Sequence, residues 1–108
     1  IICIMAKIDY VPIIFRVDKN NNVFAIFPTI PGTSDASTST IYDQSGGHTS
    51  GDVFMCIRTS RPASLEQYQQ MYEHLLSIGY KIRIVKRCSN KMHLSRLRLV
   101  EEYLKEKG

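Results

Sequence analysis

The sequence predicts a single α+β domain built on an antiparallel sheet, and three observations lead to that prediction. Two apolar, β-branched segments flank a short polar turn, a pattern typical of a hairpin. Two later segments repeat apolar residues at helical spacing. The chain of 108 residues, 44% hydrophobic and 22% charged, has the size and composition of one globular domain. We therefore expect one core over residues 1–108, in the order β-β-(long loop)-β-α-β-α, with two helices packed on the sheet.

The first two strands are predicted at residues 12–17 (PIIFRV) and 23–27 (VFAIF). The asparagines between them tolerate the positive φ angles that a tight hairpin turn needs. The second segment does not alternate between apolar and polar residues, which indicates burial on both faces and a central place in the sheet. Pro28 and Pro31 follow and are expected to end this strand, because proline cannot donate to a central ladder.

The middle of the chain, residues 33–52, is dominated by Ser, Thr, Gly and Asp. This composition predicts a long loop that is either functional or disordered. Residues 53–59 (VFMCIRT) return to an apolar composition, and we expect a third strand there.

The first helix has the clearest boundaries in the sequence. Ser64 is a favourable N-cap, and Gln67 three residues later completes a capping box. The apolar positions that follow share one helical face. Gly79 is placed where a helix ends with a left-handed residue, and Tyr80 is placed to make the hydrophobic contact that often follows. We therefore predict a helix that starts after Ser64 and ends before Gly79.

Residues 81–87 (KIRIVKR) alternate between basic and apolar positions, which predicts a half-exposed strand. Ile82 and Ile84 are expected to face the core, and Lys81, Arg83 and Val85 to face outward. Ser89 or Asn90 is expected to cap a final helix over residues 90–106.

Apolar residues of this final helix spread over more than half of its circumference, whereas a helix packed on one face needs a stripe of only ~100°. Either the helix wedges between the sheet and the first helix, or part of the arc meets a partner protein or a second copy of the chain. Arg96 lies within the arc and would need a carboxylate such as Glu101 or Glu102 across the interface. The candidate interface residues are Leu97, Val100 and Leu104.

Basic residues gather late in the chain. There are 14 Lys and Arg against 10 Asp and Glu, for a net charge of +4, and residues 81–98 contain no carboxylate. Such a run is either a solvated face or an attractor of nucleic acid through phosphate contacts. The segment has no aromatic residue on which bases could stack, and no RNP, KH or zinc-finger signature. The candidate nucleic-acid-binding residues are Lys81, Arg83, Lys86, Arg87, Lys91, Arg96 and Arg98.

A second candidate site lies in the predicted long loop, where His48 is flanked by Gly47 and follows Tyr42 and Asp43. A loop histidine of this kind can serve as a general base or a ligand. The sequence has no nucleophile motif, no phosphate loop and no second histidine nearby. We therefore expect no enzymatic activity, and we assign no catalytic residue, metal site or cofactor.

Cys3, Cys56 and Cys88 are odd in number and form no CxxC pair, which argues against a disulfide framework and a zinc site. Cys56 is expected to be a small buried hydrophobe. No apolar stretch approaches the ~20 residues that cross a bilayer, so we expect no membrane association and a cytoplasmic location. Residues 1–8 are expected to be a flexible leader, with residues 1–4 preceding a natural start at Met5.

Three stretches, PIIFRVDKNNNVFAIFPTIPG, GGH and RTSRPASLEQYQQMYEHLLSIGYKIRIVKR, resemble a family of small uncharacterised proteins of gut bacteroidetes, their mobile elements and crAss-like phages. The pattern of that family is an "IFR…G…AxFP" hairpin, a glycine-histidine loop and a "TKPATxEEY…L…IGY…VIKR" segment, and the match covers most of residues 12–87. The resemblance implies a phage or mobile-element accessory protein in the cytoplasm of a bacterial host cell, and it brings no known activity. Where the family has a GQHG-like run, this chain has GGHT at residues 46–49.

The segment FPTIPG at residues 27–32 is also similar to the strand ending "FPDLPG" of the HicB antitoxin fold. That likeness implies an antitoxin or regulator that binds a toxin partner, as an analogy of fold. The sequence thus favours a non-enzymatic accessory module that binds a protein partner or itself as a homodimer. A basic nucleic-acid-binding module is the first alternative, and a HicB-like antitoxin is the second.

Overall fold

The computed structural model describes residues 10–107, so the leader expected at residues 1–8, with Cys3, lies outside the described residues. The described part is an α+β fold, as the sequence predicts, but it has six strands and three helices where four strands and two helices were expected. The elements in chain order are β1 (Val11–Asp18), β2 (Val23–Pro31), β3 (Thr38–Asp43), β4 (His48–Asp52), α2 (Val53–Arg58), β5 (Ser60–Pro62), α3 (Leu65–Ser77), β6 (Ile82–Ile84) and α4 (Asn90–Lys107). None of the helices within residues 10–107 is long and apolar enough to cross a membrane.

The six strands form one sheet in the order β4-β3-β2-β1-β5, and β6 also pairs with β1. All pairs are antiparallel except β1 with β6, which is parallel. The second edge of β1 is shared along its length: its first residues pair with β6 and its last residues with β5. The central position predicted for β2 is therefore confirmed.

The hairpin between β1 and β2 is also confirmed. Its turn is closed by the carboxylate of Asp18, which accepts hydrogen bonds from the N–H groups of Asn20 and Asn22 at 2.8 and 2.9 Å. Asn21 adopts the positive φ angle, 64°, for which asparagine is suited. The prolines after this hairpin do not end β2, contrary to expectation. The strand continues through Pro31 with an irregularity in its register between Phe27 and Pro31, the kind of position where a sheet tolerates proline.

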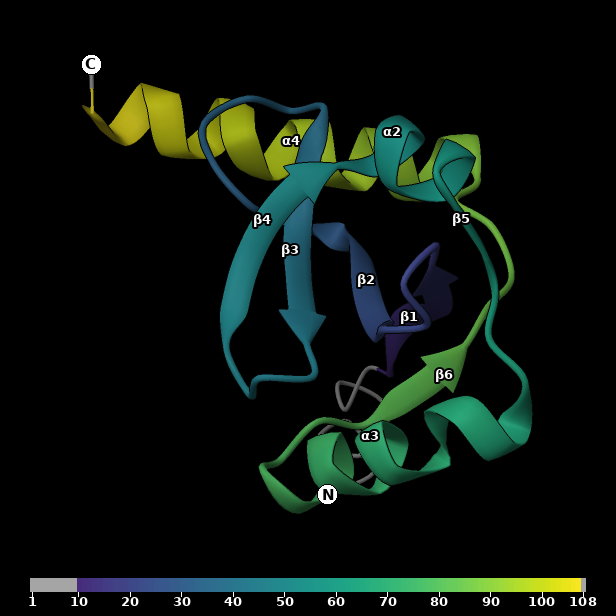
Figure 1. Cartoon of the computed structure of the whole chain (residues 1–108). Helices are drawn as coiled ribbons and strands as arrows, with labels where there is room; N and C mark the ends of the chain where they lie inside the picture. The colour runs from purple at the N-terminus through teal and green to yellow at the C-terminus, as the bar shows by residue number, and fades with distance from the viewer. Residues whose placement is uncertain (1–9, 108) are drawn as a thin grey trace.

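Helices cover both faces of the sheet (Figure 1). Phe15 is part of the core on one face, where it stacks on Tyr68 of α3 with ring centroids 4.6 Å apart. On the other face, Ile14 and Ile26 pack beside α2 and the segment that leads into α4. Since α3 and α4 lie on opposite sides of the sheet, the expected wedge of the last helix between sheet and first helix is wrong.

The long loop expected at residues 33–52 contains a second hairpin, β3 and β4. Its few large apolar residues, Ile41 and Tyr42, are buried because β2 supplies the adjacent strand. The intervening residues are small and polar, so the composition concealed the pairing. Gly46, with a φ angle of 88°, forms the turn.

The third strand expected at residues 53–59 is instead the short helix α2. Its N-cap is Asp52, whose carboxylate accepts a hydrogen bond from the N–H of Met55 at 3.0 Å. Val53 is buried, whereas Phe54 is 63% exposed. Cys56, expected to be buried, is half-buried on this helix, and burial raises the pKa of its thiol.

Helix α3 begins and ends as predicted. Ser64 and Gln67 form the capping box. Gly79 has a φ angle of 112°, and the N–H of Tyr80 donates to the carbonyl of Leu75 at 3.1 Å, as in a Schellman motif.

Strand β6 is shorter than the predicted strand at residues 81–87. Ile82 is buried as expected, but Ile84 is 43% exposed. Val85, expected to face outward, packs against the core beside Ile14. The chain leaves the strand here to cross toward α4. Ser89 is the residue that caps α4, since its hydroxyl accepts from the N–H of Met92 at 3.2 Å.

Candidate functional site

A groove lies where α4 passes the start of β1 and the end of β2, and we call it the basic groove. Its volume is about 700 Å³. Three basic residues line it, and none of the described residues that line it is an aspartate or a glutamate. Its lining is Tyr10, Pro12, Thr29, Ile30, Arg83, Ser89, Lys91, Met92, Ser95, Arg98 and Leu99.

The three cations come together from two elements. Lys91 and Arg98 are seven residues apart, which places them on nearly the same face of α4. Arg83 follows the buried Ile82 on β6, so the alternation of the strand turns its side chain away from the core. All three side chains are exposed. The groove therefore presents positive charge to solvent without a built-in counter-ion among its lining residues.

The groove also holds an aromatic residue that the sequence analysis missed. Tyr10 immediately precedes β1, is 62% exposed and lines the groove. In sequence it lies more than seventy residues from the basic run. The parallel pairing of β1 with β6 brings Arg83 near it, and the packing of α4 on β2 brings Lys91 and Arg98 to the same groove. Thr29, Ser89 and Ser95 add hydroxyl groups along the wall. The groove thus contains cations, hydroxyl donors and an exposed ring.

The structure divides the seven predicted basic residues into three groups. Arg83, Lys91 and Arg98 line the groove, while Lys81, Lys86 and Arg87 are exposed but are not part of its lining. The prediction that Arg96 contacts nucleic acid is wrong, because its side chain is fully buried. Its expected carboxylate partner, Glu101 or Glu102, is also wrong. The Arg96 guanidinium donates instead to two backbone carbonyls of its own chain, those of Pro28 and Ala36, and it also bonds Nδ1 of His93 and the sulfur of Cys88.

The predicted site around His48 is partly assembled. His48 on β4 is paired with Tyr42 on β3, and their rings meet edge to face with centroids 4.9 Å apart. Nε2 of His48 forms a hydrogen bond of 2.9 Å with the hydroxyl of Tyr80, the residue that follows the left-handed Gly79 at the end of α3. The carboxylate of Asp43 accepts hydrogen bonds from the hydroxyl and the backbone N–H of Ser45, in the turn of the same hairpin. These bonds, chiefly the one from the hydroxyl, lower the pKa of Asp43.

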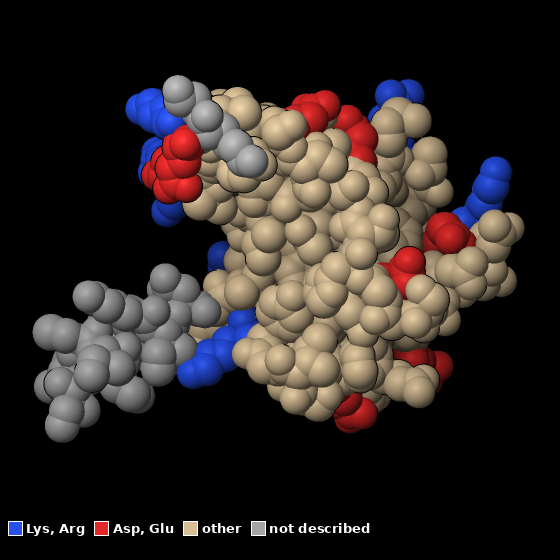
Figure 2. Space-filling model, turned by 90° about the vertical axis from the view of Figure 1, so that its left-hand side faces the viewer, with Lys and Arg blue, Asp and Glu red and all other residues tan. Residues whose placement is uncertain are grey.

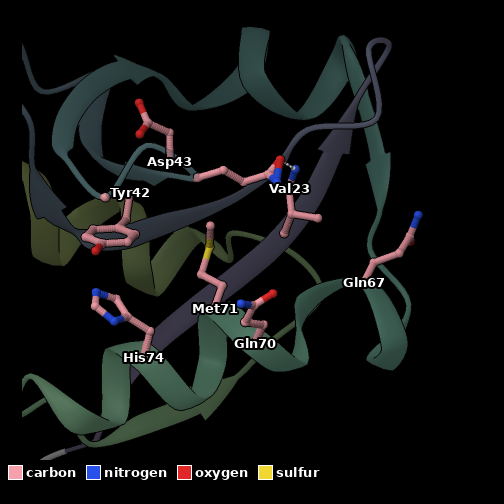
Figure 3. A pocket seen from close by; sticks show the side chains of 9 residues that line it. Val23, Tyr42, Asp43, Gln67, Gln70, Met71 and His74 are labelled. Carbon is pink, nitrogen blue, oxygen red and sulfur yellow. Dashed lines mark hydrogen bonds between the residues drawn. The ribbon is translucent and has the colours of Figure 1, made fainter.

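A cavity of about 300 Å³ lies between this hairpin and α3 (Figure 3). Tyr42, Met71 and His74 point toward one another at its centre, whereas Asp43 points away. His74 is exposed, yet the centroid of its ring lies 5.8 Å from that of Tyr42. Within residues 10–107 no three metal-ligating side chains come together. The cavity therefore combines an aromatic wall and glutamine amides without a ligand set for a metal.

The three residues of the predicted interface on α4 differ in how far they are buried. Val100 is buried against its own chain, Leu97 is half-buried and Leu104 is 50% exposed. At 100° per residue Arg96 and Leu104 each lie about 40° from Val100, on the same side of the helix. Leu104 is the more exposed of the three because it lies one turn beyond Val100, toward the C-terminal end of α4. Val100 therefore does not need a second subunit to be buried.

No protein-family model, curated protein or solved structure matches the chain. The resemblances to the phage and mobile-element family and to the HicB fold stay predictions from the motifs quoted above.

Proposed function

We propose that this chain is a non-enzymatic nucleic-acid-binding module that holds a single strand along the basic groove. The observation that carries the proposal is the convergence of Arg83, Lys91 and Arg98 on one groove whose described lining has no carboxylate. Phosphate groups are the ligands that such an arrangement attracts, through charge and counterion release. An accessory role in a phage or mobile element is compatible with a module of this kind.

The exposed ring of Tyr10 favours a single strand over a duplex. Bases of a single strand are free to stack on aromatic side chains, and one such contact contributes about 1–3 kcal/mol. The hydroxyl groups of Ser89 and Ser95 stand beside the cations and suit phosphate or sugar oxygens. We expect affinity to be nearly independent of sequence, because neither kind of contact identifies a base.

The test is the binding of labelled single-stranded DNA, single-stranded RNA and duplex DNA over a salt series, read by fluorescence anisotropy. Three phosphate contacts predict a slope of log affinity against log salt of about −2 for single strands. The variant Arg83→Glu with Arg98→Glu should lose most of the binding. Its matched control is Lys86→Glu with Arg87→Glu, which changes the net charge equally outside the groove.

We expect the control to weaken binding far less than the groove variant, and Tyr10→Ala to reduce affinity by about five- to hundredfold for single strands. Equal losses in the two double variants would show a diffuse charge effect and no groove. Absence of binding by the wild type at low salt would remove the proposal altogether.

Protein binding through α4 is the second candidate function. It is favoured by Leu104, an apolar residue in the C-terminal half of α4 that is 50% exposed. Leu97→Asp with Leu104→Asp tests it, because those substitutions should abolish any association that uses this side of the helix.

A further inference from the structure

The hydroxyl of Tyr42 is a polar group on a buried side chain, and within residues 10–107 it has no hydrogen-bond partner. Tyr42 is only 3% exposed, and a buried phenolic hydroxyl usually finds a partner. The hydroxyl lies beside Gly46 in the hairpin turn, where a Cβ atom would be 3.8 Å from it. Both residues line the cavity between the β3–β4 hairpin and α3. The hydroxyl is therefore open to the cavity and able to bond to a ligand there.

Three glutamine amides line the same cavity, and hydrogen bonds fix the orientation of two of them. Oε1 of Gln44 accepts from the N–H of Val23 at 2.7 Å, and Oε1 of Gln67 accepts from the N–H of Ser64 at 2.8 Å. A backbone N–H bonds to the oxygen of an amide, so the NH2 groups of these two residues remain as donors. The side chain of Gln70 has no hydrogen bond in the described part of the chain. The free amide groups are therefore mainly donors, which suit a ligand with carbonyl acceptors.

Helix α3 supplies the apolar and aromatic part of the cavity. Gln70 and Met71 lie four and three residues before His74, which places all three on one side of the helix. Their side chains rise from α3 toward the hairpin (Figure 3). Met71 is buried, whereas the imidazole of His74 is exposed at the rim. Flat heterocycles stack on histidine as they do on other aromatic side chains, so this wall favours a planar ligand.

The cavity offers no positive charge to a ligand. None of its described lining residues is a lysine or an arginine. Its one carboxylate, that of Asp43, is bonded to Ser45 and points away from the centre. On the side of the molecule that carries β4 of the same hairpin, Lys, Arg, Asp and Glu lie around an uncharged centre (Figure 2). A phosphate group would therefore find no counter-charge here, in contrast to the basic groove, with which the cavity shares no lining residue.

We propose that this cavity binds a small, neutral, planar ring that carries carbonyl oxygens, the chemistry of a uracil-type nucleoside. The carbonyl oxygens accept from the hydroxyl of Tyr42 and the NH2 group of Gln44. A ring N–H donates to Oε1 of Gln70, and the ring lies against His74. The volume of about 300 Å³ is at the lower limit for ligand pockets, so it suits one ring system better than a dinucleotide. The proposal does not rest on the proposed function of the basic groove.

The test is a titration of the isotopically labelled protein with uridine, followed by NMR of the glutamine side-chain NH2 groups. We expect the signals of Gln44 and Gln70 to shift and saturate. The signal of Gln69, an exposed neighbour on α3 outside the lining, should stay unchanged. Gln70→Ala should weaken binding about two- to tenfold through the lost hydrogen bond, with Gln69→Ala as its matched control. Tyr42→Phe should weaken binding by a similar factor without lowering the free energy of unfolding, because its hydroxyl has no partner in the described chain.

Absence of saturable shifts up to the solubility limit of uridine overturns the proposal, since the cavity would then hold only water. Tighter binding of uridine monophosphate than of uridine also overturns it, because the phosphate would be the group recognised. Glucose, which is neither flat nor rich in carbonyls, should not bind, and equal binding of glucose and uridine overturns the proposal. So do equal losses in Gln70→Ala and Gln69→Ala. Should Tyr42→Phe fail to fold, the two glutamine variants decide.

A last arm separates this site from the basic groove. Arg83→Glu with Arg98→Glu should bind uridine as the wild type does, because neither arginine lines the cavity. Loss of uridine binding in that variant would assign the nucleoside to the groove and overturn the proposal. Uridine carries no phosphate, so a failure here leaves the proposed function of the groove untouched.

Discussion

Arg96 on α4 donates from Nη1 to the backbone carbonyl of Pro28 on β2 at 2.7 Å, from a side chain that is fully buried. The irregularity of β2 after Phe27 leaves this carbonyl outside the regular ladder. Nε of the same guanidinium donates to the carbonyl of Ala36 at 2.7 Å. One arginine thus joins the last helix to a central strand and to the connection between β2 and β3.

We expect Arg96→Ala to lower the free energy of unfolding by about 3 kcal/mol or more. It leaves two carbonyls without donors and opens a cavity. Arg96→Lys should also destabilise, because an ammonium group lacks the planar fork that serves both carbonyls. The matched control is Arg98→Ala, an exposed arginine on the same helix, with an expected change within about 0.5 kcal/mol. Urea unfolding followed by circular dichroism measures both, and equal changes would contradict the structural role of Arg96.

This arginine illustrates what the sequence could not reveal. Helical periodicity distinguished Arg96 from Lys91 and Arg98, because it placed Arg96 inside the apolar arc. Its carbonyl acceptors, on Pro28 and Ala36, lie in distant segments, and backbone acceptors have no residue type by which the sequence could reveal them. The bond to His93, three residues earlier on the same helix, is a partner that the helical spacing could have indicated.

Local signals predicted local structure well. The capping box at Ser64, the left-handed Gly79 and the asparagine turn at Asn21 each determine the conformation within a few residues. The β3–β4 hairpin was missed because Thr40 and Ile41 belong to a strand of mainly polar residues, whose pairing with β2 the composition does not indicate. Helix α2 was missed for another reason: its apolar residues were interpreted as a strand, although the local N-cap signal, Asp52, directly precedes them.

His48 and Tyr80 provide a second stability test. The hydrogen bond between them should couple their contributions by about 0.5–1.5 kcal/mol. Tyr80→Phe removes only the hydroxyl, and His48→Ala removes the imidazole together with its ring contact to Tyr42. A double-mutant cycle measured by thermal or urea unfolding gives the coupling energy. Strictly additive effects would mean that the bond contributes nothing, and a fully stable His48→Ala would favour a functional role for His48.

Acid should weaken the β1–β2 hairpin. The carboxylate of Asp18 accepts hydrogen bonds from the backbone N–H groups of Asn22 and Asn20. These bonds, chiefly the one from Asn22, hold the pKa of Asp18 below its usual value. A carboxyl group whose pKa is lower in the folded state than in the unfolded chain stabilises the fold above the unfolded pKa, about 3.9. That stabilisation is lost as pH falls through the lower folded pKa.

We therefore expect the free energy of unfolding to decrease below about pH 4, by chemical denaturation at a series of pH values. Asp18→Asn keeps a side-chain carbonyl that can accept the turn hydrogen bonds but cannot titrate, so its stability should depend less steeply on pH. Asp43, whose pKa Ser45 lowers, contributes in the same direction and accounts for part of the remaining slope. A slope in Asp18→Asn identical to that of the wild type would show that Asp18 is not responsible.

Val100 and Leu104 on α4 should behave oppositely, although the sequence placed them on one stripe. Val100 is 5% exposed and Leu104 is 50% exposed, because α4 extends past the sheet toward its C-terminal end. Val100→Ala should cost about 2 kcal/mol, the lost burial plus the cavity left behind. Leu104→Ala should change the free energy of unfolding by no more than about 0.5 kcal/mol. Measured at low protein concentration, comparable losses for the two variants would mean that the exposed flank of α4 is packed within the monomer. A loss for Leu104→Ala that appears only at high concentration would show that a second copy covers it.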